Sequence, residues 1–219
     1  MKFSILSLSL LLSVPAFADL LVDGDFESAS GERIIFSVGS AEPQPAPGFA
    51  TAPPGFPGEG ATSMMTLGSF SNSNNLNGVY QDIDVDGSDF SVGDMIQVTG
   101  FAGILPGDPI TSTNVEAWLE ISFFDPGGME EFEIGTHISA KIVDATPDDE
   151  WFELDTSMAI IPANAQFIRV KAILNQRNFE NGVVYFDNLS LKVIPEPGTF
   201  GLFALGTALL FFRSRRARA

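Results

Sequence analysis

The chain has 219 residues and a formal net charge of −17 at pH 7, because 28 Asp and Glu residues stand against only 11 Lys and Arg residues. This surplus argues against nucleic acid as a partner, since phosphates and carboxylates repel one another. The chain has no cysteine, which excludes disulfides, cysteine nucleophiles and iron–sulfur clusters. A single histidine, His137, leaves little room for a zinc site or a Ser-His-Asp triad and is expected to be an ordinary residue on a strand.

The first 18 residues have the pattern of a secretory signal peptide. Lys2 precedes an apolar segment, 3–14, and small residues follow at Ala16 and Ala18. This order predicts cleavage by signal peptidase after Ala18. A retained N-terminal membrane helix is the alternative, although the apolar segment is short for a bilayer crossing.

Residues 19–194 form the predicted working domain and hold 27 acidic and six basic residues, which gives a formal charge of −21. Alternating apolar and polar residues, interrupted by Gly, Pro, Asn and Asp, predict short strands rather than helices. Loops are expected over the proline-rich residues 40–60 and over 71–78. The expected fold class is all-β, a jelly-roll β-sandwich of about nine strands. These strands are expected at 20–26, 61–70, 79–85, 94–102, 114–125, 131–142, 151–156, 166–175 and 183–193.

One predicted strand contains a partial calcium-binding pattern. Residues 82–87 place aspartate at alternate positions and glycine at the sixth, as in the first half of an EF-hand loop. The twelfth position, however, is Gly93 rather than Glu, and no flanking helices are expected. A strand is the favoured interpretation, with Ile83 and Val85 pointing inward.

The segment 195–219 combines three features of a processing signal. Pro195, Glu196 and Pro197 disfavour regular structure, and an apolar run at 200–212 and an arginine-rich tail follow. As a helix the run would be about 20 Å long, which is short for a stable crossing of about 30 Å. The three parts in this order resemble the PEP-CTERM sorting signal of Gram-negative bacteria.

This resemblance implies a route of export. The short transmembrane segment, 200–212, would hold the protein transiently in the inner membrane, with its arginines on the cytoplasmic side. An exosortase would then cut near 195–197 and release the body to the cell surface or the extracellular space. Such proteins usually accompany exopolysaccharide production. The alternative is an ordinary C-terminal anchor, which would need neither the Pro-Glu-Pro nor so short a run.

The body carries short motifs in a recognisable order. It opens with Val-Asp-Gly-Asp-Phe-Glu at 22–27, continues with Val-Tyr-Gln-Asp-Ile at 79–83 and with Trp151, and closes with Val-Tyr-Phe-Asp-Asn-Leu-Ser-Leu at 184–191. This order resembles the jelly-roll carbohydrate-binding modules of the galactose-binding-domain-like group. The proline-rich stretch 43–57 departs from that family, which usually carries a tryptophan there. The resemblance implies that Trp151 anchors an edge of the core.

The same resemblance implies a structural calcium ion where the first and last strands meet. Carried over by position, the ligands are Asp25, Glu27 and Asp187, with backbone carbonyls completing the shell. Ca²⁺ prefers six to eight oxygen ligands, and clustered carboxylates repel one another unless a cation lies among them. The alternative is that these are solvated acids at a sheet edge.

The predicted strand 114–125 has one apolar face for the core and an opposite face that carries Glu116, Trp118 and Glu120. An exposed tryptophan between two carboxylates is unusual, because exposed aromatic area is costly. It is a candidate sugar-binding surface, since the indole stacks on sugar CH groups and carboxylates accept hydrogen bonds from hydroxyls. Arg169 and Lys171 alternate outward on another strand and are expected on the same sheet. The alternative is that a loop covers Trp118 and that these cations pair with the acids.

These features predict an exported, non-catalytic protein at the cell surface or in the extracellular matrix that associates with exopolysaccharide. A structural biofilm-matrix protein with no specific ligand is the first alternative. A polysaccharide-processing enzyme is the second, since a glycosidase needs only two carboxylates. With 27 acids in the body, such pairs arise easily by chance, and the sequence marks none of them as buried or perturbed.

Overall fold

The computed structural model describes most of the predicted body. The predicted processing residues Ala18, Pro195, Glu196 and Pro197 lie outside the described residues, as do the calcium candidate Glu27 and the expected membrane segment. The described residues are 19–26, 34–37, 40–45, 62–67, 74–85, 90–104, 106–107, 109–125, 132–148, 150–178, 180 and 182–194.

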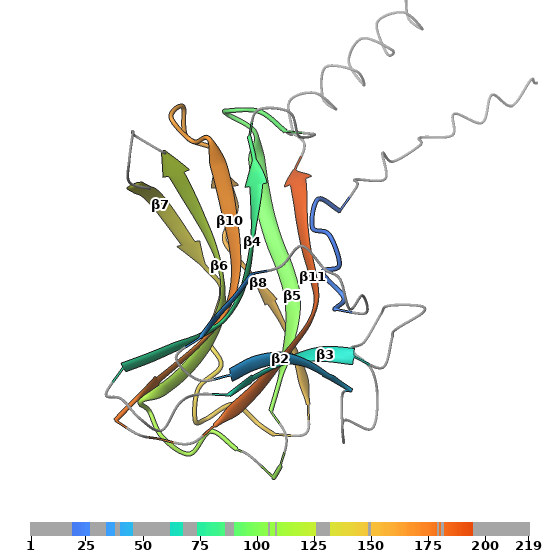
Figure 1. Cartoon of the computed structure of the whole chain (residues 1–219), viewed down its shortest axis with the longest axis vertical. Coiled ribbons are helices and arrows are strands. Elements are labelled where there is room, and N and C mark those ends of the chain that lie inside the picture. Colours follow the sequence, from blue (N-terminus) through green and yellow to red (C-terminus); the bar gives the residue numbers. More distant parts are fainter. Residues whose placement is uncertain are drawn as a thin grey trace, which may run out of the picture.

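Two antiparallel sheets face each other in a β-sandwich (Figure 1). The five-stranded sheet has the order β1-β4-β10-β6-β7, and the other sheet has the order β2-β3-β11-β5-β8, with the short β9 also paired to β5. The predicted all-β sandwich is therefore confirmed. The strands are β1 (Ile34–Ser37), β2 (Ser40–Pro45), β3 (Thr62–Leu67), β4 (Asn74–Asp84), β5 (Met95–Gly103), β6 (Val115–Asp125), β7 (Phe132–Ile138), β8 (Trp151–Asp155), β9 (Ala159–Ile160), β10 (Phe167–Arg177) and β11 (Val183–Ile194).

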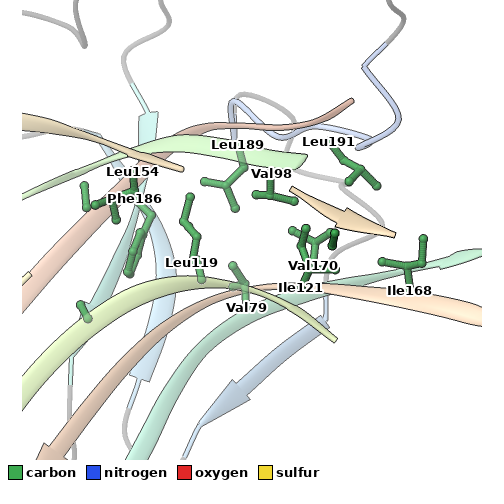
Figure 2. Packing of buried hydrophobic residues seen from close by; sticks show 14 of the residues in the cluster. Val79, Val98, Leu119, Ile121, Leu154, Ile168, Val170, Phe186, Leu189 and Leu191 are labelled. Carbon is green, nitrogen blue, oxygen red and sulfur yellow. The ribbon is translucent and has the colours of Figure 1, made fainter. Parts of the chain in front are cut away.

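Strand β6 shows how the sequence alternation builds the core. Leu119 and Ile121 are fully buried between the sheets, whereas Trp118 on the opposite face is only partly buried. Figure 2 shows these side chains meeting Val98 and Leu191, which come from the other sheet. The predicted apolar face of 114–125 is therefore the core face, as expected for a strand with one side toward the opposing sheet.

The five-stranded sheet is curved. Its strands bow toward the other sheet, so that the outer face of the five-stranded sheet is concave (Figures 1 and 2). Side chains on this outer face come from alternate positions of β4, β10, β6 and β7, which lie side by side in that order. A concave sheet face lets side chains from several strands converge on one bound molecule.

Residues 20–26, predicted to be the first strand, form turns instead. Asp23 and Phe26 both have φ of 57°, which is a left-handed conformation that a strand does not contain. The amide of Phe26 donates a hydrogen bond of 3.1 Å to the carbonyl of Asp23, which closes the turn. Phe26 nevertheless ends in the core and is almost fully buried. The strand prediction was wrong because the apolar residues of this segment fit both a strand and a turn that buries one side chain.

The 20–26 segment still lies against the last strand, as the family resemblance implied. The amide of Leu20 donates to the carbonyl of Leu191 over 3.2 Å, and the amide of Leu189 donates to the carbonyl of Gly24 over 2.8 Å. The contact at Gly24 is so close that a Cβ atom there would lie 2.0 Å from the Leu189 carbonyl oxygen. We call residues 19–26 together with 188–191 of β11 the N-terminal seam.

Three strands were not expected from the sequence, and one begins earlier than expected. β1 and β9 fall in segments that were left unassigned, and β2 falls inside the predicted loop 40–60. β2 contains two prolines but is the outermost strand of its sheet, the position where proline is tolerated because one side of the strand has no ladder partner. β4 begins at Asn74, inside the predicted loop 71–78, because 74–77 continue the pairing with β10.

Two smaller expectations hold. Val85 is buried, Ile83 packs against the core, and Asp82 and Asp84 are exposed, so 82–85 follow the strand interpretation rather than that of a calcium loop. His137 lies on β7, where its Nδ1 atom is 3.2 Å from the Ser157 hydroxyl.

Candidate functional site

A groove of about 350 Å³ opens on the concave outer face of the five-stranded sheet. We call it the concave groove. Three adjacent strands, β4, β10 and β6, supply its walls and floor. It is lined by Leu76, Tyr80, Trp118, Glu120, Arg169, Lys171 and Ile173.

The strand register brings these side chains together. In one row across the sheet, Lys171 of β10 is paired with Tyr80 on one side and Glu120 on the other, and in the next row Ile173 is paired with Trp118. Directly opposed residues in an antiparallel sheet point to the same face, with Cβ atoms about 4.5–5.5 Å apart. The groove therefore follows from alternation within each strand and from the order of the strands.

Glu120 is the centre of a hydrogen-bonded network in the groove. Its Oε1 accepts from the Lys171 ammonium over 2.6 Å and from the Ser122 hydroxyl over 2.9 Å, while its Oε2 accepts from the indole Nε1 of Trp118 over 3.0 Å. Burial acts to raise the pKa of Glu120, but the hydrogen bonds from Lys171 and Trp118 and the charge of Lys171 outweigh it and leave the pKa below its usual value. Glu120 is thus ionised at neutral pH and holds the indole in place.

Arg169 is fixed by a second set of contacts. Its guanidinium donates two hydrogen bonds of 2.7 Å to the two carboxylate oxygens of Asp82, a bidentate pair. The guanidinium carbon also lies 4.2 Å from the ring centroid of Tyr80 and 4.8 Å from that of Phe124. Cation–π contacts of this kind add to the pairing and restrict the side chain. Arg169 is therefore a rigid edge of the groove.

Three of the four predicted ligand-binding residues, Trp118, Glu120 and Arg169, line the concave groove. Glu116 does not line it, and its carboxylate instead pairs with the ammonium of Lys141 at 2.8 Å. That ammonium lies 5.1 Å from the centroid of the Trp118 ring. The alternative interpretation expected Arg169 and Lys171 to pair with acids. Lys171 does pair with Glu120, whereas Arg169 pairs with Asp82.

The sequence interpretation missed Tyr80, Leu76 and Ile173 as groove residues. Tyr80 lies two positions before Asp82 on the same face of a predicted strand, so alternation alone would have placed it outward. Leu76 fell in a predicted loop, and Ile173 is an apolar residue on the outer face, which a search for polar sites does not select. Apolar residues at outward positions of the strand alternation are therefore the signal that would have found Leu76 and Ile173.

The predicted calcium ligands are partly described. Asp25 lines a pocket of about 380 Å³ at the N-terminal seam, together with Asp19 and Asp23. Asp187 does not line this pocket; it is buried, and its Oδ1 accepts the backbone N–H of Asn188 over 2.7 Å. Among the described residues no three Asp, Glu or His side chains gather closely enough to hold a metal ion. Oxygen donors of this kind suit Ca²⁺, but Glu27 lies outside these residues, and the calcium site stays a prediction.

The end of the described chain leads into a known signal. Residues 193–216 match the family model of the PEP-CTERM protein-sorting motif. The chain carries a PEP-CTERM sorting motif. This marks it as an exported, exosortase-sorted protein and confirms the resemblance drawn from the sequence. Among the residues that the structure describes, no helix has the length and hydropathy of a bilayer-spanning segment. The predicted span 200–212 lies beyond them.

The body is similar in fold to several solved structures. The carbohydrate-binding module TmCBM61, solved in complex with β-1,4-galactotriose, gives a TM-score of 0.51 at 13% identity over 81% of this chain and 99% of that module. The enzymatically active domain of tailspike protein 4 of bacteriophage CBA120 gives a TM-score of 0.51 at 14% identity, over 80% of this chain and 21% of the tailspike chain.

A family 22 carbohydrate-binding module of Clostridium thermocellum Xyn10B is also similar, with a TM-score of 0.49 at 15% identity over 77% of this chain and 90% of that module. At identities of 13% and 14%, the two structures with TM-scores of 0.51 show a shared β-sandwich fold and nothing about the ligand. The chain covers only 21% of the tailspike's own length. No curated protein sequence matches the chain.

Proposed function

We propose that this protein is a non-catalytic, exported β-sandwich that binds exopolysaccharide through the concave groove after its release at the cell surface. The observation that carries the proposal is the Trp118 indole, which lines the groove and is held by a hydrogen bond of 3.0 Å to Glu120. The sorting motif supports the location, because it directs the chain to the outside of the cell, where such polymers lie.

The chemistry of the groove suits a polymer of hydroxyl-bearing rings. Trp118 and Tyr80 offer aromatic surfaces, and Leu76, which is 49% exposed, extends them, whereas Ile173 is almost fully buried. Because the indole N–H is already donated to Glu120, Trp118 would bind through its ring rather than through its polar edge. A side chain that is fixed before binding loses little conformational entropy on contact with the ligand, which favours affinity.

The contacts of the two carboxylates described at the groove support the non-catalytic part of the proposal. Such enzymes need one carboxylic acid with a raised pKa to protonate the leaving group. The pKa of Glu120, the carboxylate that lines the groove, is instead lowered, and the nearby Asp82 holds both of its oxygens against Arg169. An assay for new reducing ends after incubation with the polysaccharide tests this point, and their release would contradict it.

Binding itself is tested with the full chain and polysaccharide isolated from the organism that makes it, in the presence of calcium. Trp118→Ala is expected to weaken binding about tenfold or more, which corresponds to the loss of one central aromatic contact of about 1.4 kcal/mol or more. Trp151→Ala is the matched control, because Trp151 lies on β8 in the other sheet. Isothermal titration calorimetry measures both affinities.

Two outcomes would contradict the proposal in different ways. If the unaltered protein binds and Trp118→Ala binds equally well, the site lies elsewhere on the molecule. If the unaltered protein shows no binding, the alternative of a structural matrix protein without a specific ligand is favoured. The strongly acidic body is compatible with that role, since it would keep such a protein dissolved in a matrix.

A further inference from the structure

One end of the sandwich is where the chain leaves for its sorting signal. Strand β11 ends at Ile194, which pairs with Met95 at the start of β5, and Met95 also pairs with Ile160 of β9. The upper part of Figure 1 shows this end, with the head of the β11 arrow. We call it the exit end.

Apolar side chains gather at the exit end. Ile160 is 60% exposed, Met158 57% and Val92 46%, and these are among the most exposed large apolar residues of the described chain. Phe132, at the start of β7, is also exposed and lies where β6 ends. Exposure of several large apolar residues at one end of a charged domain is typical of a contact surface.

This surface is held in shape by backbone hydrogen bonds. The amide of Gly93 donates to the carbonyl of Ile161, and the amide of Ile161 donates to the carbonyl of Asp94, each over 3.0 Å. These bonds fasten the turn that carries Val92 to the segment that carries Ile160. The apolar side chains are therefore presented by an ordered part of the fold, and little ordering is needed when they make a contact.

The exit end lies close to the membrane while the sorting segment is still attached. Residues 195–199 separate Ile194 from the apolar run at 200–212. Even fully extended, five residues reach only about 17 Å. A tether this short keeps the exit end at a high effective concentration near the bilayer, so that a weak contact is enough to hold it there.

We propose that the exit end is a membrane-contact surface: before cleavage, Val92, Met158 and Ile160 rest at the headgroup level of the bilayer from which the chain emerges. This rests on the proposed export and on the predicted route in which the segment 200–212 anchors the chain before release. Apolar side chains at an interface gain by leaving water, even when few are buried. Lipid is favoured over a charged partner because the contacting side chains are apolar.

The negative charge of the body predicts which lipids favour this contact. Residues 19–194 have a formal charge of −21, so an anionic lipid surface repels them. The contact therefore depends on apolar side chains and on the tether, and it is expected to be stronger on uncharged lipid. The concave groove lies on a side of the sandwich, with Tyr80 and Lys171 four residues from the ends of their strands at the exit end. Contact at the exit end would leave the groove open to polysaccharide.

The experiment uses the full chain, which contains no cysteine, so that one introduced cysteine carries one fluorescent label. Ile160→Cys reports on the exit end, and Thr113→Cys is its control, since Thr113 is exposed and lies just before β6, at the end of that strand opposite to Asp125 and Phe132. Leu205→Cys, inside the apolar run, reports on insertion. The chains are reconstituted in vesicles of phosphatidylcholine that contain nitroxide-bearing lipid as a quencher.

The label at 160 is expected to be quenched at least about twofold more than the label at 113, because only the former reaches the headgroup level. Adding phosphatidylglycerol is expected to reduce that difference. Equal quenching at 160 and 113 would overturn the proposal. No quenching at 205 would also overturn it, since the sorting segment would then not hold the chain at the membrane.

A protein partner gives a different result. If the label at 160 is shielded only when exosortase is added to the vesicles, the exit end is a protease-docking surface and not a lipid contact, and the proposal is wrong. Polysaccharide binding by the unlabelled chain, measured separately in solution, reports on the proposed function. Its failure would not alter the quenching results, so the two ideas are tested independently.

Discussion

The concave groove and the N-terminal seam both contain carboxylates, but the chain builds them in opposite ways. The groove is made of side chains that stand on regular strands, and its acids are matched by cations, as Glu120 is by Lys171 and Asp82 by Arg169. The seam is made by irregular backbone, with left-handed residues at Asp23, Phe26 and Asn188 and a break in register between Asp187 and Ser190.

This difference separates binding from stability. Side chains on the outer face of a regular sheet are replaceable without moving the backbone, so the groove can change its ligand while the fold stays the same. The seam joins the start of the described chain to its last strand through close backbone contacts. A change there is therefore expected to lower the stability of the whole fold. We therefore expect substitutions in the seam to affect unfolding more than those in the groove.

The largest effect is expected from Gly24→Ala. The new Cβ would lie 2.0 Å from the carbonyl oxygen of Leu189, a backbone atom that cannot rotate away. Relieving the clash requires separating the seam from β11 and is expected to lower the free energy of unfolding by about 3 kcal/mol. Denaturant titration followed by circular dichroism measures this change.

Gly107→Ala is the matched control, because nothing lies within 4 Å of a Cβ atom at that position. Its stability is expected to stay within about 0.5 kcal/mol of the unaltered protein. If both alanine variants unfold at the same denaturant concentration, the seam is not the point on which the fold depends, and the comparison with the groove fails.

The same difference explains how much the sequence could predict. The long strands were found because alternation is a local pattern: β6 was expected at 114–125 and runs over Val115–Asp125. The two-sheet sandwich follows from such strands and their turns. The turns of the seam were not found, because the left-handed backbone of Asp23 and Phe26 depends on contacts with β11 that lie far along the chain.

The sequence also did not predict which side chains pair across neighbouring strands. The face that carries Trp118 and Glu120 follows from alternation, but the choice of Asp82 as the partner of Arg169 depends on β4 lying beside β10. The same holds for Glu116, which was expected at the sugar surface and instead meets Lys141, brought near by the bridge between Ala117 and Ile142. Strand order is a property of the whole fold, which alternation within a strand does not determine.

A smaller effect on unfolding is expected from removing calcium, and it would act at the seam. If Asp25, Glu27 and Asp187 hold an ion, an ion at 100 times its dissociation constant adds about 2.7 kcal/mol to the free energy of unfolding. For a body of this size, that corresponds to a fall in melting temperature of about 5–10 °C on addition of EDTA. Differential scanning calorimetry measures the shift.

Two variants assign the calcium effect to one region. Asp25→Asn is expected to lose most of the response to EDTA, whereas Trp118→Ala, in the groove, is expected to keep it. An unchanged melting temperature with EDTA, together with no bound metal by elemental analysis, would remove the calcium prediction. The seam would then be held by its backbone contacts alone.

The smallest effect is expected from Glu120→Gln in the groove. The glutamine keeps the shape of the side chain but loses the charge that Lys171 and Trp118 meet, which is expected to cost about 2 kcal/mol at neutral pH. Glu116→Gln is the control, since its pair with Lys141 is more exposed and is expected to contribute less than about 1 kcal/mol.

The pH dependence of this loss identifies its cause. The pKa of Glu120 in the folded protein lies below its ordinary value of 4.5, so the stabilisation from its charge is complete above that pH and is lost as the pH falls through the lower, folded-state pKa. The difference in unfolding free energy between the unaltered protein and Glu120→Gln is therefore expected to shrink as the solution is acidified. A difference that stays constant from neutral to strongly acidic pH would mean that Glu120 acts through packing, and the groove would then resemble the seam in depending on shape rather than on paired charge.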